Sequence, residues 1–222
     1  MRNNEAEMYP INLKLDNRQC TVVGGGEVAY RKIQRLLENN AHITVIAPMV
    51  KAQIKALAQA GKITWRQETY SKPLLEGSFC VFCATDNRGV NRQAALEAKE
   101  SGMLVNVASE PELCDFTLPG VVQRGRLQLT VSSEGASPAF TRLLRQDMER
   151  RYHQGFGEMA EYIEALRQEL IAEGAGEGKT TSEQRQRLWR QALTPDIIEL
   201  IYNQELDRAK YEIRNAINRA RS

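Results

Sequence analysis

The feature that most constrains this chain is a glycine-rich turn at residues 21–32, between an apolar run and a helical pattern. Gly24, Gly26 and Ala29 match the spacing G-x-G-x-x-A. In a strand–turn–helix unit, the first glycine permits a tight turn and the second admits a pyrophosphate to the backbone. The small third residue lets helix and strand pack closely. Because the first N–H groups of the helix attract phosphates, we expect dinucleotide binding rather than a purely structural turn.

Strand-like and helix-like segments alternate through the first half of the chain. Apolar runs bounded by turn residues predict strands, and apolar positions at helical spacing predict helices. Strands are expected at 19–23, 43–47, 63–65, 79–84 and 104–107, and helices at 27–39, 50–60 and 88–100. This order predicts an α/β fold with an N-terminal Rossmann-like parallel sheet and helices on both of its faces.

The pattern changes after about residue 113. Short strands are expected at 116–118, 121–123 and 127–131, with a hairpin turn at Arg124-Gly125-Arg126. Ser137 is a suitable N-cap for a helix that begins at Pro138 and runs to about Arg151. The chain is helical from Gly157 onward. We therefore expect three parts: the Rossmann-like domain over 1–115, a small α+β region over 116–152 and a helical domain over 153–222.

Composition excludes several classes of protein. The net charge of +2 gives no global field for nucleic acid, and no apolar run approaches the roughly 20 residues of a membrane helix. The first ten residues are polar and acidic, unlike a signal peptide. Four scattered cysteines indicate reduced thiols. We expect a cytoplasmic protein that binds neither nucleic acid nor membrane and, with His42 and His153 far apart, no zinc site.

Two short motifs do not support the chemistry that they suggest. Residues 174–180, GAGEGKT, have one residue too few for a P-loop and follow a helix, so a linker between helices is the better interpretation. Cys80 and Cys83 form C-x-x-C on an expected strand, where residues three apart face opposite sides of the sheet. We expect two buried cysteines rather than a redox or metal pair.

The ends of two strands bear on cofactor binding. In Rossmann domains an acid after the second strand binds the adenosine ribose, but here the sequence is Ile46-Ala47-Pro48-Met49. Backbone groups near Pro48 and Met49 are the alternative, and the residues alone do not separate NAD from NADP. Thr85, Asp86 and Asn87 follow the fourth strand, where ligand-binding and turn-forming interpretations are equally good.

Arginines are concentrated between residues 121 and 151. The residues favour a solvated helix face with ion pairs four residues apart. The alternative is a wall that binds carboxylates, which arginine pairs through two parallel hydrogen bonds. The arginines of this segment are Arg124, Arg126, Arg142, Arg145, Arg150 and Arg151.

Four stretches together resemble a known family. The first is YPINL at 9–13, which opens the family's first strand region, and the second is VVGGGEVAYRK at 22–32. The third is formed by two segments taken together, ATD at 84–86 and NVASEPELCDFTL at 106–118, and the fourth is VSSEGASPAFTRLL at 131–144. The last is the most specific, because it is not a general Rossmann feature. Over residues 8–150 the chain resembles precorrin-2 dehydrogenase, the N-terminal module of siroheme synthase.

The resemblance implies an enzyme that oxidises precorrin-2, a tetrapyrrole, to sirohydrochlorin with NAD. It also implies a homodimer, for which residues 116–152 form the dimerisation region, and a helical domain beside the cofactor cleft. The methyltransferase domain of the trifunctional relatives does not fit in 222 residues, so we expect the stand-alone form.

The resemblance also assigns candidate site residues. The macrocycle is expected over the nicotinamide, between the sheet edge and residues 132–145. The resemblance therefore favours the interpretation in which the arginines of this segment bind carboxylates. The candidate cofactor-binding residues are Gly24, Gly26, Glu27, Val28, Pro48, Met49, Thr85 and Asp86, and the candidate substrate-binding residues are Ser132, Ser133, Ser137 and Arg142.

One residue departs from the family pattern. Many relatives carry an aspartate, linked to catalysis or chelation, where this chain has Ser109. A serine is neither a base near neutral pH nor a carboxylate ligand for iron. Ser109 and Asp115 are the candidate catalytic residues, with Glu110 as a further nearby acid. Two other functions stay open: a dehydrogenase that also inserts iron, and a non-catalytic sensor that binds NAD or a tetrapyrrole.

Overall fold

A computed structural model of the chain describes residues 8–173 and 182–221. They form two compact units that meet in sequence between Thr117 and Leu118. The GAGEGKT segment at 174–180 lies outside the described residues. Among the described helices, none is long and apolar enough to cross a membrane.

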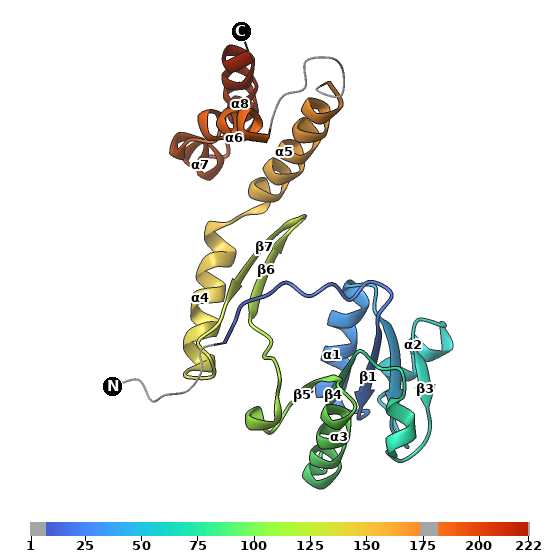
Figure 1. The fold of residues 1–222 in the computed structure, drawn as a ribbon. Coiled ribbons are helices and arrows are strands. Elements are labelled where there is room, and N and C mark those ends of the chain that lie inside the picture. The colour runs from blue at the N-terminus through green and yellow to red at the C-terminus, as the bar shows by residue number, and fades with distance from the viewer. Residues whose placement is uncertain (1–7, 174–181, 222) are drawn as a thin grey trace. The chain divides into compact units, whose positions relative to one another are not determined.

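The first unit is built on a parallel sheet of five strands in the order β3-β2-β1-β4-β5 (Figure 1). Each strand pairs in parallel with its neighbour, which confirms the Rossmann-like prediction. The strands are β1 (Gln19–Val23), β2 (His42–Ile46), β3 (Thr64–Arg66), β4 (Cys80–Cys83) and β5 (Leu104–Val107). The helices are α1 (Glu27–Glu38), α2 (Ala52–Gln59) and α3 (Arg88–Glu100), with the 3-10 turns η1 (Lys72–Leu75) and η2 (Pro111–Leu113).

Apolar side chains of the strands pack into two cores, one on each face of the sheet. Ile33 of α1 and Ile54 of α2 belong to the core on one face, which we call the α1 face. Ala95 of α3 belongs to the core on the other face. Cys80 lies on the α1 face and Cys83 on the opposite face, both about 1% exposed. The prediction that these cysteines are buried on opposite sides is therefore confirmed.

The second unit begins with an antiparallel hairpin of β6 (Gly120–Arg124) and β7 (Leu127–Val131). Gly125 takes φ +52° at the first position of the two-residue loop, where glycine is favoured. Helix α4 (Pro138–Arg151) lies along this hairpin (Figure 1). The remaining helices share a separate apolar core. They are α5 (Gln154–Glu173), α6 (Ser182–Ala192), α7 (Pro195–Tyr202) and α8 (Leu206–Arg221).

The family's opening segment at residues 9–13 and the expected strand at 116–118 are not strands. Residues 9–13 form no ladder, and Tyr9 and Ile11 expose 87% and 65% of their surface. Residues 116–118 also lie outside any strand. Phe116 there packs its ring edge-on against Phe82, and its carbonyl accepts a hydrogen bond from the Asn106 side chain. A side-chain partner thus replaces the strand neighbour that the apolar pattern suggested.

Candidate functional site

The turn between β1 and α1 needs two of its glycines for close packing. Gly24 takes φ +130°, and a Cβ there would lie 2.7 Å from the carbonyl carbon of Ala84. A Cβ on Gly25 would lie 2.9 Å from the Cα of Val50. The turn is therefore held against the chain that follows β4 and the chain that follows β2.

Gly26 differs from its two neighbours. A Cβ on Gly26 would meet no atom within 4 Å, so protein packing does not require glycine at this position. Gly26 is also the N-cap residue of α1, and α1 has no side-chain cap. The N–H groups of its first turn, among them that of Val28, therefore lack a side-chain acceptor and can bind an anion. Open space beside free backbone donors fits the pyrophosphate of a dinucleotide.

A charged pair lies beside the start of α1. The Lys51 ammonium forms an ion pair with the Glu27 carboxylate, and this hydrogen bond lowers the pKa of Glu27. The backbone N–H of Lys51 donates to the carbonyl oxygen of Gly25 at 2.9 Å. Lys51 is a residue that the sequence did not single out, since only the packing of the turn against the chain after β2 brings it to Glu27.

The chain after β2 supplies the expected neighbours of the turn. Pro48 and Met49 are exposed, with Met49 82% exposed, and the Met49 carbonyl lies against Gly25. The indole of Trp65 donates to the carbonyl oxygen of Ala47 at 2.9 Å. Apart from Lys51, backbone and apolar groups of this segment therefore lie on this side of the turn, and the segment supplies no acid.

The chain after β4 is a hydrogen-bonded turn. The Asn91 side chain, which is 1% exposed, accepts from the N–H of Thr85 at 3.0 Å and donates to its carbonyl oxygen at 3.0 Å. Asn87 caps α3 by accepting from Val90 N–H at 3.2 Å. Asp86 is exposed and has no side-chain partner among the described residues. Thr85 and Asn87 thus build the turn, and Asp86 is left available.

Asp115 makes structural contacts at the edge of β5. Its carboxylate accepts from the N–H of Val105 at 2.9 Å, and its own N–H donates to the carbonyl oxygen of Val105 at 2.9 Å. Its second carboxylate oxygen lies 2.8 Å from the Lys99 ammonium. If Asp115 transfers a proton, it must do so with a carboxylate that already binds the Val105 N–H and the Lys99 ammonium.

Ser109 and Glu110 follow β5, at the carboxyl end of the sheet. Ser109 is exposed and has no partner among the described residues. Glu110 forms an ion pair with Arg92 at 3.2 Å, and its Oε1 is buried without a hydrogen-bond partner. Ser109 and Glu110, which are consecutive in the chain, thus both lie at the end of the sheet where ligands bind in parallel α/β folds.

In the second unit, the candidate serines hold the loop before α4. Ser137 caps α4 by accepting from Phe140 N–H at 3.2 Å. Ser133 Oγ accepts from Ser137 N–H at 3.2 Å and lies 2.8 Å from the Thr141 hydroxyl. Ser132 Oγ accepts from the Glu134 N–H at 3.2 Å. These three serines therefore organise the loop.

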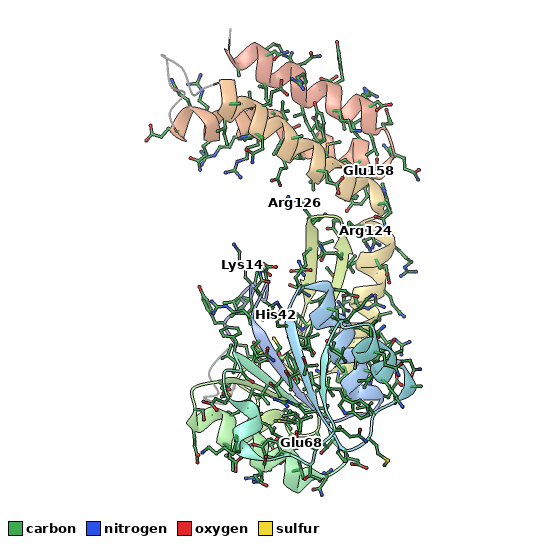
Figure 2. The ribbon with its side chains drawn as sticks, turned by 90° about the vertical axis from the view of Figure 1, so that its right-hand side faces the viewer. Lys14, His42, Glu68, Arg124, Arg126 and Glu158 are labelled. Atoms are coloured by element: carbon green, nitrogen blue, oxygen red, sulfur yellow. The ribbon has the colours of Figure 1, made fainter. Side chains whose placement is uncertain are left out.

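Five of the six arginines between residues 121 and 151 have protein partners, and the three on α4 pair with acids three or four residues away, as the solvated-face interpretation predicted. Figure 2 labels Arg124 and Arg126 at one end of the hairpin. Arg124 donates to the carbonyl oxygens of Gln123, Glu149 and Tyr152. The others form ion pairs: Arg126 with Glu164, Arg145 with Glu149, and Arg150 and Arg151 with Asp147. Arg142 is exposed and has no partner among the described residues.

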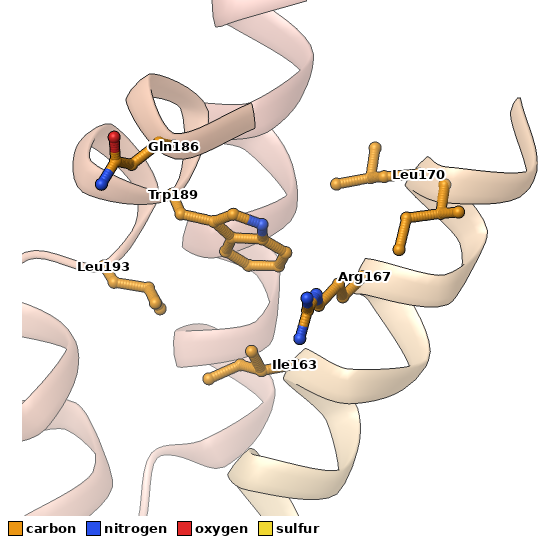
Figure 3. Close-up of a pocket in the computed structure, with 7 residues that line it drawn as sticks. Ile163, Arg167, Leu170, Gln186, Trp189 and Leu193 are labelled. Carbon is orange, nitrogen blue, oxygen red and sulfur yellow. The ribbon is translucent and has the colours of Figure 1, made fainter. Parts of the chain in front are cut away.

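The second unit also carries an apolar groove between α5 and α6. Figure 3 shows Arg167 of α5 and Trp189 of α6 on its walls, and its volume is about 440 Å³. A second hollow of about 450 Å³ lies in the first unit over Thr21, Thr44 and Arg66. Neither is lined by a candidate site residue. In the described part of the chain, no cluster of three or more His, Cys, Asp or Glu side chains could hold a metal ion.

Two family models match the chain. A model described as "Putative NAD(P)-binding" matches residues 11–120, which contain the glycine turn, and a model described as "Sirohaem biosynthesis protein central" matches residues 124–151. The two together cover the parallel sheet, β7 and α4, while residues 121–123 of β6 lie between the two matched ranges.

Similar proteins include siroheme synthases and one solved dehydrogenase. Siroheme synthase of Nitrosococcus oceani is 35% identical over 95% of this chain and 44% of its own length. Siroheme synthase of Methylococcus capsulatus is 37% identical over 87% of this chain and 40% of its own length. The chain thus spans less than half the length of these relatives.

The solved structure of SirC, precorrin-2 dehydrogenase, matches with a TM-score of 0.73 at 27% identity, over 92% of this chain and all of that one. The match to SirC extends through both units, and the siroheme synthases match at higher identity over nearly the same residues. The chain therefore belongs to the precorrin-2 dehydrogenase family, which includes the corresponding module of siroheme synthases.

Proposed function

We propose that this protein catalyses the NAD-dependent dehydrogenation of precorrin-2 to sirohydrochlorin in siroheme biosynthesis. The observation that carries the proposal is the open glycine turn at the uncapped start of α1. It occurs in a chain that matches SirC, precorrin-2 dehydrogenase, over the whole length of that protein.

The first-turn N–H groups of α1 would hold the pyrophosphate, with space provided at Gly26. The ion pair between Glu27 and Lys51 reduces the repulsion that an isolated carboxylate would exert on the phosphates. Pro48 and Met49 would contact the adenosine side, and Thr85 and Asp86 would contact the bound cofactor after β4. When bound, NAD supplies the hydride acceptor, and the protein contributes binding and orientation.

Precorrin-2 carries eight carboxylates, so its binding needs cationic and hydrogen-bonding groups. Arg142 is the candidate with a free guanidinium among the described residues, and arginine pairs well with carboxylates. Ser132, Ser133 and Ser137 would act mainly by shaping the loop before α4, since their hydroxyls already serve that loop.

Dehydrogenation also releases a proton from the macrocycle. The gain in conjugation favours this step, so the reaction does not require a strong protein base at Ser109. Ser109 and Asp115 remain the candidate catalytic residues, and Glu110 is the carboxylate that lies next to Ser109 in the chain. Because Ser109 offers no carboxylate to a metal, the proposed reaction ends at sirohydrochlorin and does not include iron insertion.

We further propose a cytoplasmic homodimer that pairs through the second unit. Helix α4 has no buried residue, and it exposes 54% of Phe140 and 56% of Leu143. Leu118 next to β6 is 50% exposed. Phe140 and Leu143 are three residues apart and so share one face of α4, and an exposed apolar face is typical of a protein interface. The four cysteines are free thiols, as is usual in the cytoplasm.

An anaerobic assay with purified protein, precorrin-2 and NAD tests the proposed activity. We expect NADH and sirohydrochlorin to form in equal amounts, and parallel reactions with NADP and with ferrous iron measure cofactor choice and metal insertion. Binding of the macrocycle without NADH formation would replace the dehydrogenase proposal by the sensor alternative. Light scattering of the same sample measures the mass, and a monomer would contradict the dimer.

A further inference from the structure

Lys32 is a half-buried cation that the proposed function has not used. It lies on α1, five residues after the first residue of the helix, or about 8 Å along its axis. Its ammonium donates to the Asn106 side-chain oxygen at 3.0 Å and lies 5.8 Å from the centre of the Phe82 ring. Asn106 and Phe82 are each one residue short of the carboxyl end of their strands, β5 and β4.

The partners of Lys32 do not neutralise its charge. Asn106 is a neutral amide that is 7% exposed, and its own N–H₂ donates to the Phe116 carbonyl oxygen at 3.0 Å. Among the described residues, no carboxylate forms an ion pair with Lys32. An ammonium has three donors, and only the bond to Asn106 is made within the described structure. Burial lowers the pKa of Lys32, and this effect outweighs the opposing influence of the nearby Cys114 thiol.

Half-buried charges in proteins are normally paired, because desolvation without compensation costs free energy. Lys32 is instead fixed in direction by a neutral acceptor and keeps part of its surface exposed. The arrangement leaves a pre-oriented positive charge on the α1 face of the sheet. It lies close to the carboxyl edge, where ligands bind in parallel α/β folds.

We propose that Lys32 is a substrate-binding residue whose ammonium, held by Asn106, binds one carboxylate of the tetrapyrrole. This inference rests on the proposed function and deepens it, because the substrate of that reaction is a polycarboxylate. The Asn106 side chain is then a positioning residue that sets the direction of the ammonium. The second protein partner is the Phe82 ring, whose negative face further stabilises the cation before the substrate binds.

Binding of uroporphyrin III tests the inference without turnover, because this stable macrocycle also carries eight carboxylates. Lys32→Gln and Lys32→Met remove the charge, and the methionine keeps the apolar stem. We expect each to weaken uroporphyrin binding about tenfold, or about 1.4 kcal/mol, and to reduce its salt dependence. Lys32→Arg should stay within about threefold of the parent protein. Arg35→Gln removes an exposed charge one turn further along the same helix and should have no effect.

Three further readouts separate substrate binding from a structural role. The KM for precorrin-2 should rise about tenfold in Lys32→Gln with kcat nearly unchanged, and the affinity for NAD should not change. Equal uroporphyrin affinity in Lys32→Gln and the parent protein would overturn the inference, as would a loss confined to NAD binding. The inference would also be overturned if every Lys32 variant, Lys32→Arg included, lost uroporphyrin binding only to the extent that its melting temperature fell. Failure of the parent protein itself to bind uroporphyrin and to form NADH would instead reject the proposed function.

Discussion

The carbonyl carbon of Ala84 lies 2.7 Å from the position that a Cβ on Gly24 would occupy. Together with the positive φ of Gly24, this contact explains why the turn after β1 has glycine at its first position. Gly26, two residues later, has open space around its missing side chain. Packing therefore requires glycine only at the first of these two positions, and the space at Gly26 is the part of the turn that the proposed function assigns to the ligand.

Gly24→Ala is expected to lower the free energy of unfolding by about 2–4 kcal/mol, because the methyl group overlaps the backbone in a conformation unfavourable for alanine. Gly26→Ala should stay within about 1 kcal/mol of the parent protein. It should nevertheless weaken NAD binding at least about tenfold, because the methyl group takes the space of the pyrophosphate. Urea unfolding and calorimetric titration with NAD measure the two effects. Unchanged NAD affinity in Gly26→Ala would place the dinucleotide elsewhere.

Arg124 and Arg142 make a second matched pair, both in the second unit. Arg124 donates to three backbone carbonyl oxygens, so Arg124→Ala should destabilise this unit by about 2–4 kcal/mol. Arg142→Ala removes an unpartnered side chain and should change stability by less than about 0.5 kcal/mol. Trp189 fluorescence in a Trp65→Phe background reports the unfolding of this unit alone, since the chain has two tryptophans.

The same Arg142→Ala variant tests the candidate substrate site. We expect it to raise the KM for precorrin-2 while the melting temperature stays unchanged. An unchanged KM would remove Arg142 from the binding residues.

Burial raises the pKa of the Cys83 thiol from 9.0 to about 12, with the nearby Cys114 as the second cause. Because the folded state favours the protonated thiol, this contribution to stability is complete below pH 9. It is lost as the pH rises from 9 towards 12, where the unfolded chain forms thiolate. Between pH 8 and pH 10.5 the parent protein should lose about 1–2 kcal/mol more than Cys83→Ala. Cys83→Val, which fills more of the space, should show the same shallow pH slope in urea unfolding.

Asp115→Ala separates a structural role from a catalytic one. Loss of the bond to Val105 N–H should lower the free energy of unfolding by about 1–3 kcal/mol. The half-exposed ion pair with Lys99 should add less than about 1 kcal/mol. The kcat measured well below the melting temperature should stay within about threefold. A fall of about 10²-fold or more would make Asp115 a proton-transfer residue.

Ser109→Ala gives the corresponding test at the position of the family aspartate. We expect NADH formation to stay within about threefold, because a serine is not a base near neutral pH. Glu110→Gln, measured in the same assay, tests whether the neighbouring carboxylate accepts the proton that the macrocycle releases. A large loss in either variant would show that the gain in conjugation is not sufficient to drive the release of the proton.

Local spacing predicted the elements whose causes lie close together in the chain. The glycine turn, the alternating strands and helices of the first unit and the hairpin loop at Gly125 were all predicted correctly. The same holds for Cys80 and Cys83, because the period of a strand alone places them on opposite faces. The apolar segment 116–118 was predicted wrongly, since its hydrogen-bond partner is the Asn106 side chain and not a strand.

Contacts between distant residues were outside the reach of the sequence. The thiols of Cys20 and Cys80 lie 3.3 Å apart although 60 residues separate them, because β1 and β4 are neighbours in the sheet. The ion pair of Lys51 with Glu27 and the hydrogen bond of Asn91 with Thr85 likewise depend on which segments are in contact in the folded protein. The periodicity of apolar residues in the sequence does not predict such contacts between distant loops and strands.

The sequence by itself determined the fold class, the position of the glycine turn and the family, because each depends on residue types at short, fixed spacings. Only the tertiary structure decided which charges are already neutralised by protein partners. It separated Arg142 from the five paired arginines and Asp86 from its turn-forming neighbours, and it found the uncompensated ammonium of Lys32. The physical reason is that a side chain can bind a ligand only with the hydrogen-bonding capacity that the folded protein leaves unused.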